Sequence, residues 1–63
     1  MIGRRIARLR KQLNITQEDL AASVGISREY LSNIERGHES ISIRLLAQIA
    51  KALNVEISCL LDG

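Results

Sequence analysis

The sequence predicts an all-α fold, a compact orthogonal bundle of about five short helices in a single domain that covers residues 1–63. The chain has no proline, and 46% of its residues are hydrophobic, nearly all of them aliphatic. Apolar residues recur every three or four positions, as they do along one face of a helix. Residues that typically cap or stop helices separate these periodic segments.

We expect helices over residues 2–13, 17–24, 28–36, 43–53 and 56–61. The first carries an apolar stripe at helical spacing, formed by Ile2, Ile6, Leu9 and Leu13. Asn14 follows it and can adopt the left-handed conformation that ends a helix. Thr16 is then placed to cap the second helix, with Asp19 as the other half of a capping box.

A tight turn at Gly25 joins the second helix to the third, because glycine readily takes the positive φ that such a turn needs. Ser27 is the expected N-cap of the third helix and Gly37 its stop. The inward positions of this helix pair are expected to be Leu20, Ala21, Val24, Ile26, Tyr30, Leu31 and Ile34.

The fourth helix is expected to begin after a cap at Ser42 and to stop at Asn54. It is predicted to present a wide apolar face, as a central helix does. The expected inward residues are Ile43, Leu46, Ala47, Ile49, Ala50 and Leu53. The short fifth helix would carry Ile57, Leu60 and Leu61.

The formal net charge is only +2, which does not by itself indicate nucleic acid. The distribution is more informative, because five of the nine Lys and Arg residues fall within the first eleven positions, where there is no acidic residue. One end of the domain is therefore strongly positive.

Composition also excludes several classes of protein. Cys59 is the only cysteine and His38 the only histidine, so an internal disulfide and a Cys/His metal set are both excluded. No nucleophile–base pair or glycine-rich phosphate loop is present, and we expect no enzyme activity, cofactor, metal or small-molecule substrate. No apolar run approaches the roughly 20 residues that span a bilayer. A lone thiol and the lack of a signal-peptide pattern predict a cytoplasmic protein without membrane association.

The third helix carries a polar stripe. Five residues follow the i, i+1, i+4, i+5, i+8 spacing of one helical face: Arg28, Glu29, Ser32, Asn33 and Arg36. These side-chain types can hydrogen-bond base edges in the major groove, which admits one α-helix. An ordinary solvated helix face carries the same residue types, and for this helix taken alone that interpretation stays open.

Four segments resemble the Xre/Cro family of phage-repressor-like helix-turn-helix proteins: residues 17–21 (QEDLA), 24–27 (VGIS), 31–37 (LSNIERG) and 46–55 (LAQIAKALNV). The resemblance covers essentially the whole chain. It implies a bundle of the phage-repressor DNA-binding type, with the helix-turn-helix at the second and third helices. It also implies a sequence-specific transcriptional regulator whose partner is double-stranded DNA and whose third helix enters the major groove. Such a regulator could repress by occlusion or activate by contact with polymerase, and repression is the role we expect.

The resemblance further implies roles for individual residues. Arg28, Glu29 and Asn33 match base-contacting positions, and Ser32 matches a position nearer the backbone from which it could contact a base or a phosphate. Gln17 matches a residue that bonds a phosphate and braces the first residue of the third helix. The other expected phosphate contacts are Tyr30, Arg10, Arg36, His38 and Arg44.

Arg10 and Glu35 are expected to form a structural ion pair. Arg10 lies at the edge of the first helix's apolar stripe, and Glu35 directly follows the inward residue Ile34. Both therefore lie too near the core to be left unpaired. Proteins of the resembled family pair the matching residues.

Val55, Ile57, Leu60 and Leu61 near the C-terminus are expected to form a homodimer interface, so that two copies would bind a palindromic operator. The alternative is that they only close the core of one subunit. A second hypothesis for function is a helical protein–protein interaction module of the same fold that does not bind DNA. It is favoured by the charge balance of the third helix, where the two positive charges of Arg28 and Arg36 are cancelled by the two negative charges of Glu29 and Glu35.

Overall fold

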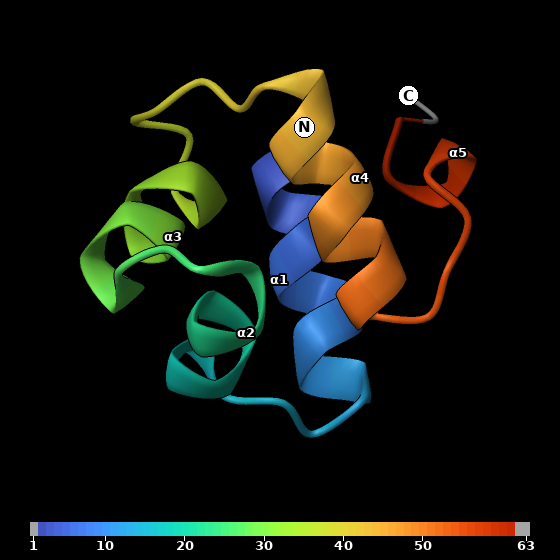
Figure 1. Ribbon diagram of the computed structural model, residues 1–63, viewed down its shortest axis with the longest axis horizontal. Helices are drawn as coiled ribbons and strands as arrows, with labels where there is room; N and C mark the ends of the chain where they lie inside the picture. Colours follow the sequence, from blue (N-terminus) through green and yellow to red (C-terminus); the bar gives the residue numbers. More distant parts are fainter. Residues whose placement is uncertain (1, 62–63) are drawn as a thin grey trace.

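The computed structural model describes residues 2–61, so the expected domain of residues 1–63 includes three positions, 1, 62 and 63, that lie outside the described residues. The described part is all-helical, with α1 at Ile2–Gln12, α2 at Gln17–Val24, α3 at Arg28–Glu35, α4 at Ile43–Ala52 and α5 at Ser58–Leu61. In Figure 1, α2 and α3 lie on one side and α5 on the other, with α1 and α4 between them. α1 packs against α3 and α5, and α2 packs against α3 and α4.

Three helices begin at the predicted caps. The hydroxyls of Thr16, Ser27 and Ser42 accept hydrogen bonds from the backbone N–H groups three residues later, at 3.0, 3.0 and 3.1 Å. Each cap thereby satisfies one N–H group that the helix itself leaves without a partner. The capping box is only half formed: the Asp19 backbone N–H donates to the Thr16 hydroxyl, but within residues 2–61 no hydrogen bond runs from the Thr16 backbone N–H to the Asp19 carboxylate.

The helices also stop where the sequence predicts. Asn14, Gly25, Gly37 and Asn54 all have positive φ, between 59° and 80°. Each lies in the same double hydrogen-bond pattern: after α2, for example, Ile26 N–H donates to Ala21 O at 3.0 Å and Gly25 N–H donates to Ala22 O at 3.3 Å. This is the Schellman motif, which satisfies carbonyls that a helix end would otherwise leave open.

The core gathers residues from all five helices, with Ile6, Leu20, Leu31, Leu46, Ile49 and Leu60 the largest fully buried side chains. Ile34 and Ala21 are buried as predicted, and Val24, Ile26 and Tyr30 are partly buried against the cluster. Leu13 was expected inward but is 48% exposed. It follows the last residue of α1, where the chain leaves the helical path to turn at Asn14.

The predicted inward face of α4 is wrong in part. Ile43 is 67% exposed and Ala47 is also exposed, whereas Leu45, which was not expected inward, is buried. Apolar residues occupy nearly every position from 45 to 50, so periodicity alone did not fix the rotation of this helix. In the packed structure, α4 is rotated about its axis so that Leu45 is buried together with Leu46, Ile49 and Ala50.

The helix boundaries differ slightly from the predicted ones. α1, α3 and α4 each end one residue early, a difference within the usual uncertainty of helix ends. α5 begins at Ser58, two residues later than predicted, because Glu56 and Ile57 belong to the turn that follows Asn54. No helix in the described part of the chain has the length and apolar character needed to cross a membrane.

Candidate nucleic-acid interface

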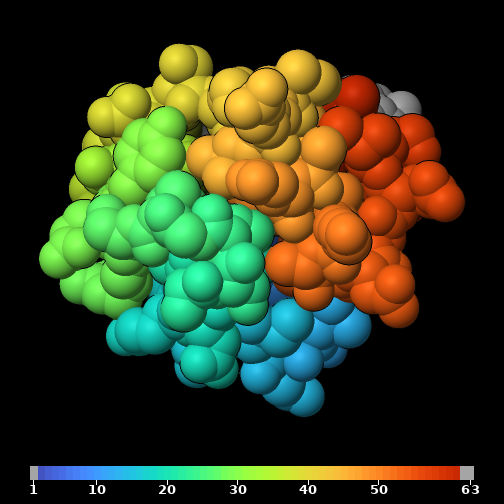
Figure 2. Space-filling model, in the orientation of Figure 1, coloured from blue at the N-terminus to red at the C-terminus, as the bar shows by residue number. Residues whose placement is uncertain are grey.

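The polar stripe of α3 faces outward. Arg28, Glu29 and Arg36 are exposed, and Ser32 and Asn33 are half-buried. On the opposite side of the same helix, Leu31, Ile34 and Glu35 are buried. α3 forms one edge of the molecule in Figures 1 and 2, with no other element outside it in that view. The face that the sequence singled out is therefore accessible to a partner.

α3 is held against α1 by a close backbone approach at Gly3. A Cβ atom at this position would overlap the carbonyl oxygen of Ile34 and would lie 3.1 Å from the Cα atom of Glu35. Only glycine permits this helix-to-helix distance. Gly3 was missed in the sequence analysis, although an isolated glycine within an amphipathic helix is a recognisable sign of close packing.

A buried hydrogen-bond network holds the C-terminal end of α3. Arg10 donates from Nε to Oε2 of Glu35 at 2.8 Å and from Nη2 to Oε1 at 3.0 Å. Its Nη1 donates to the carbonyl of Ile15 at 2.9 Å. Gln17 Nε2 also donates to Glu35 Oε1, at 3.0 Å. The expected Arg10–Glu35 pair is therefore present, and Glu35 joins α1, α2 and α3.

This network corrects two expected roles. The Arg10 side chain is only 9% exposed and each of its nitrogens donates within the chain, so it is not positioned to contact a phosphate. Gln17 was expected to brace the first residue of α3, but its amide instead contacts Glu35, the last residue of that helix. The Gln17–Glu35 bond links residues that are 18 positions apart, and no pattern in the sequence predicted it.

A second, exposed pair lies at the other end of α3. Arg28 Nε lies 3.9 Å from Oε2 of Glu18, with side-chain exposures of 46% and 70%. Glu18 belongs to the first turn of α2, and Arg28 is the first residue of α3. The turn at Gly25 thus brings the N-terminal ends of the two helices to one surface.

Three of the residues expected to contact phosphate lie between the C-terminal end of α3 and the first turn of α4. Arg36 and His38 are exposed at the start of the loop that joins α3 to α4, and Arg44 is exposed in the first turn of α4. Tyr30 is half-buried and packs against the core. Because Glu35 is buried with Arg10, the exposed face of α3 carries two arginines and one glutamate. The charge balance that favoured an interaction module is therefore not present on the surface.

The C-terminal residues expected at a dimer interface divide into three groups. Leu60 is fully buried in the core, so it cannot contact a second subunit. Val55 and Ile57 are half-buried against the same core. Leu61 is 47% exposed.

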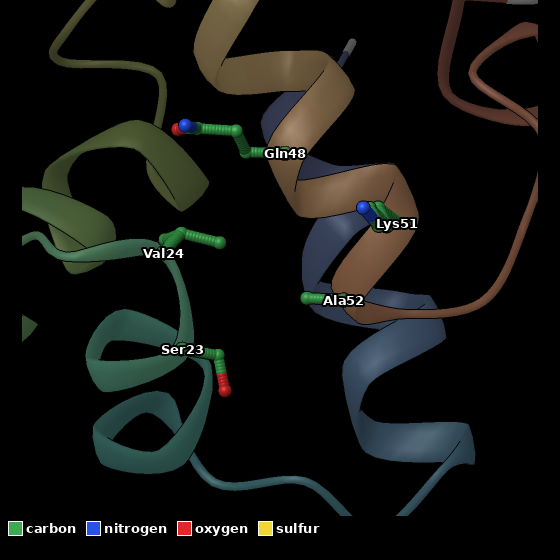
Figure 3. Close-up of a pocket in the computed structure, with 5 residues that line it drawn as sticks. All are labelled: Ser23, Val24, Gln48, Lys51 and Ala52. Atoms are coloured by element: carbon green, nitrogen blue, oxygen red, sulfur yellow. The ribbon is translucent and has the colours of Figure 1, made fainter.

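Residues 2–61 line at least two small cavities. One, of about 390 Å³, lies between α2 and α4 and is lined by Ser23, Val24, Gln48, Lys51 and Ala52 (Figure 3). The other, of about 350 Å³, lies beside the start of α1 and the α3–α4 loop. In the first cavity, the Ser23 hydroxyl donates to the backbone carbonyl of Asp19 at 2.9 Å and not to a side-chain base. Within residues 2–61, no three His, Cys, Asp or Glu side chains are grouped so as to hold a metal ion.

Comparison with known proteins places this geometry in a family. A helix-turn-helix family model (HTH_3) matches residues 6–58. The chain is 40% identical over 55 residues to an uncharacterized HTH-type transcriptional regulator, y4dJ, of Sinorhizobium fredii, covering 87% of this chain and 71% of that protein. It is 37% identical over 59 residues to the immunity repressor of Bacillus phage phi105, covering 94% of this chain but only 41% of the repressor.

A solved structure gives the same result. The crystal structure of the biofilm regulator SinR of Bacillus subtilis in complex with DNA matches with a TM-score of 0.91 at 38% identity, covering 98% of this chain and 100% of that one. Several full-length relatives are longer, and the chain spans 57% of SinR itself. The family match, the identities and the shared overall fold lead to one conclusion: this chain belongs to the HTH_3 helix-turn-helix family, whose matched members are transcriptional regulators and repressors.

Proposed function

We propose that this chain is a sequence-specific DNA-binding domain of a transcriptional regulator, which inserts α3 into the major groove and represses by occupying its operator. The observation that carries the proposal is the outward polar stripe of α3, presented by a helix that is fixed at both ends. A rigid helix orders few groups on binding, which lowers the entropic cost of association. The match to DNA-bound SinR supports the same orientation.

Within that orientation, Arg28, Glu29, Ser32 and Asn33 would meet base edges. The arginine has paired donors for guanine O6 and N7, and the asparagine can bond adenine N6 and N7. Glutamate can accept from cytosine N4, and the serine hydroxyl can bond either a base or a phosphate.

A second group of residues would position the domain on the phosphate backbone. The start of α2, at Gln17, would meet one phosphate through its backbone N–H groups, since helix N-termini attract anions. Arg36, His38 and Arg44 are exposed between the C-terminal end of α3 and the first turn of α4, and they would contact phosphates of the second strand. Tyr30 could add a hydroxyl contact from its half-buried position. These contacts would supply affinity without sequence information.

We further propose that two copies bind a palindromic operator as a homodimer. Leu61 is exposed and Val55 and Ile57 are half-buried, so all three offer some apolar area near the end of the described chain. One helix contacts only a few base pairs, so a second copy about 34 Å along the duplex would double the site that is recognised. Leu61→Asp is expected to weaken self-association in sedimentation equilibrium, whereas Leu13→Asp, at another exposed leucine, should leave it unchanged.

The test of the function is selection of bound sequences from a pool of random duplexes. The expected result is an enriched palindrome whose half-sites lie about one helical turn apart. Titration of that duplex at several salt concentrations should show affinity falling steeply as salt rises, because phosphate contacts release counterions. A pool that remains random after selection would contradict sequence-specific binding. Enrichment of a single, non-repeated site would contradict the dimer alone.

A further inference from the structure

The first turn of α2 combines two features with opposite effects on DNA. Its N-terminus would attract a phosphate, yet Glu18 and Asp19 place two carboxylates there. Acidic residues stabilise this end of a helix through its dipole, but they repel a phosphate backbone. Only one of the two is paired within residues 2–61: Glu18 lies 3.9 Å from Arg28, while the carboxylate of Asp19 makes no ion pair.

The geometry of the pair leaves the base-bonding end of Arg28 available. Glu18 approaches Nε, on the inner side of the guanidinium. Among residues 2–61, no hydrogen bond engages the two terminal nitrogens, Nη1 and Nη2, of this side chain. A guanidinium has five N–H donors in a fixed planar fork. Arg28 can therefore keep its contact with Glu18 while the outer edge of the fork bonds two acceptors of a guanine.

Arg28 would contribute less binding free energy on DNA of unrelated sequence, where it could contact only a phosphate, than on a site where it bonds a guanine. To contact a phosphate in place of a base edge, the Arg28 guanidinium must turn away from Glu18. Arg28 then exchanges one anionic partner, the carboxylate, for another, the phosphate. That exchange yields less than a phosphate contact alone would, because the exposed pair with Glu18 is lost when the contact forms. The carboxylate left behind would then repel the nearby backbone.

We propose that Glu18 is a specificity-determining positioning residue, which directs Arg28 toward base edges and suppresses its use as a non-specific phosphate contact. The inference rests on the proposed DNA-binding function and assigns to that same interface a residue that acts through Arg28. It predicts that Glu18 lowers affinity for unrelated DNA more than affinity for the operator.

The experiment compares Glu18→Gln with Asp19→Asn in the full chain. The matched control removes the same charge from the adjacent residue of the same helical turn, and its cap uses the backbone N–H, which the substitution retains. Fluorescence anisotropy measures binding to two labelled duplexes: the sequence selected by the wild type, and a shuffled duplex of equal length and composition. Each is titrated across several salt concentrations.

Glu18→Gln is expected to bind the shuffled duplex about two- to fivefold more tightly, with a smaller gain on the selected duplex, so the specificity ratio falls. The salt slope for the shuffled duplex should steepen by about 0.9, which corresponds to one added phosphate contact. Asp19→Asn should tighten binding to both duplexes equally and leave the ratio unchanged. When Arg28 is also replaced by alanine, Glu18→Gln should tighten binding to both duplexes equally and leave the specificity ratio unchanged, as Asp19→Asn does.

The proposal is overturned if Glu18→Gln and Asp19→Asn have the same effect, or if the fall in specificity persists without Arg28. Either outcome would leave the DNA-binding function intact, because the wild type would still discriminate the two duplexes. A wild type that binds both duplexes equally would instead contradict the proposed function itself.

Discussion

Two arginine–glutamate pairs attach α3 to its neighbours, one at each end of the helix, and they differ in burial. Arg10 bonds Glu35 through two nitrogens in the interior, with side chains 9% and 6% exposed. Arg28 approaches Glu18 at the surface, at 3.9 Å. The buried pair cannot release its arginine without leaving a charge unsolvated, whereas the exposed pair can exchange partners at little cost. The same two side-chain types therefore serve architecture at one end and, in the function proposed above, DNA recognition at the other.

The largest effect is expected from Glu35→Ala. It removes two bonds from the buried Arg10 guanidinium and one from Gln17, and should lower the free energy of unfolding by about 3–5 kcal/mol. Urea denaturation measures the change. Glu29→Ala in the exposed face of the same helix is the control and should shift stability by no more than about 0.5 kcal/mol. Equal losses for the two variants would remove the distinction between the buried and exposed ends.

Gly3→Ala tests the backbone contact on the buried side. The added methyl group would meet the Ile34 carbonyl, so α1 and α3 must separate, at a cost of about 1–3 kcal/mol of stability. The control is Arg4→Ala, at the exposed neighbouring position, which should change thermal stability little. If Gly3→Ala matched the control, α1 would not fix the position of α3.

Arg28→Ala should affect mainly DNA binding, whereas Glu35→Ala and Gly3→Ala affect mainly stability. We expect a loss of about 1–3 kcal/mol in binding to the selected duplex, with relaxed preference at one base position. Stability should fall by no more than about 1 kcal/mol, because the side chain is half exposed and its one ion pair, with Glu18, lies at the surface. Arg44→Ala is the comparison: as a phosphate contact it should weaken binding to all sequences and reduce the salt slope by about 1. A uniform loss across sequences with Arg28→Ala would remove it from the base-contacting set.

The smallest effect is the loss of folding stability that we expect from Glu18→Gln. An exposed pair of this kind contributes about 0.2–1 kcal/mol, and the contribution should shrink as salt screens it. Thermal unfolding at low and high ionic strength measures both. A salt-insensitive loss as large as that of Glu35→Ala would mean that the exposed pair is also structural.

Local chemistry explains which parts of the fold were predictable. The caps at Thr16, Ser27 and Ser42 and the left-handed stops at Asn14 and Asn54 depend on one or two residues each, so the sequence specifies them directly. The outward stripe of α3 follows from its clear division into polar and apolar positions.

The errors arose where several packings satisfy the same pattern. The apolar residues of α4 surround too much of the helix to define one inward face, so Ile43 was placed inside and Leu45 was not. Leu60 was assigned to a dimer interface because hydrophobicity does not distinguish a subunit's own core from a contact with a second one. The Gln17–Glu35 bond depends on how α2 and α3 cross, which no local pattern encodes.

The four Schellman endings have a consequence for kinetics. Each turn is closed by hydrogen bonds that span no more than five residues, so helix termination requires no distant part of the chain. Helical domains with mostly local contacts reach the native state in roughly microseconds to milliseconds. A newly synthesised copy of this domain should therefore complete its folding far faster than a ribosome adds the next residue, and stopped-flow or temperature-jump relaxation would time that step.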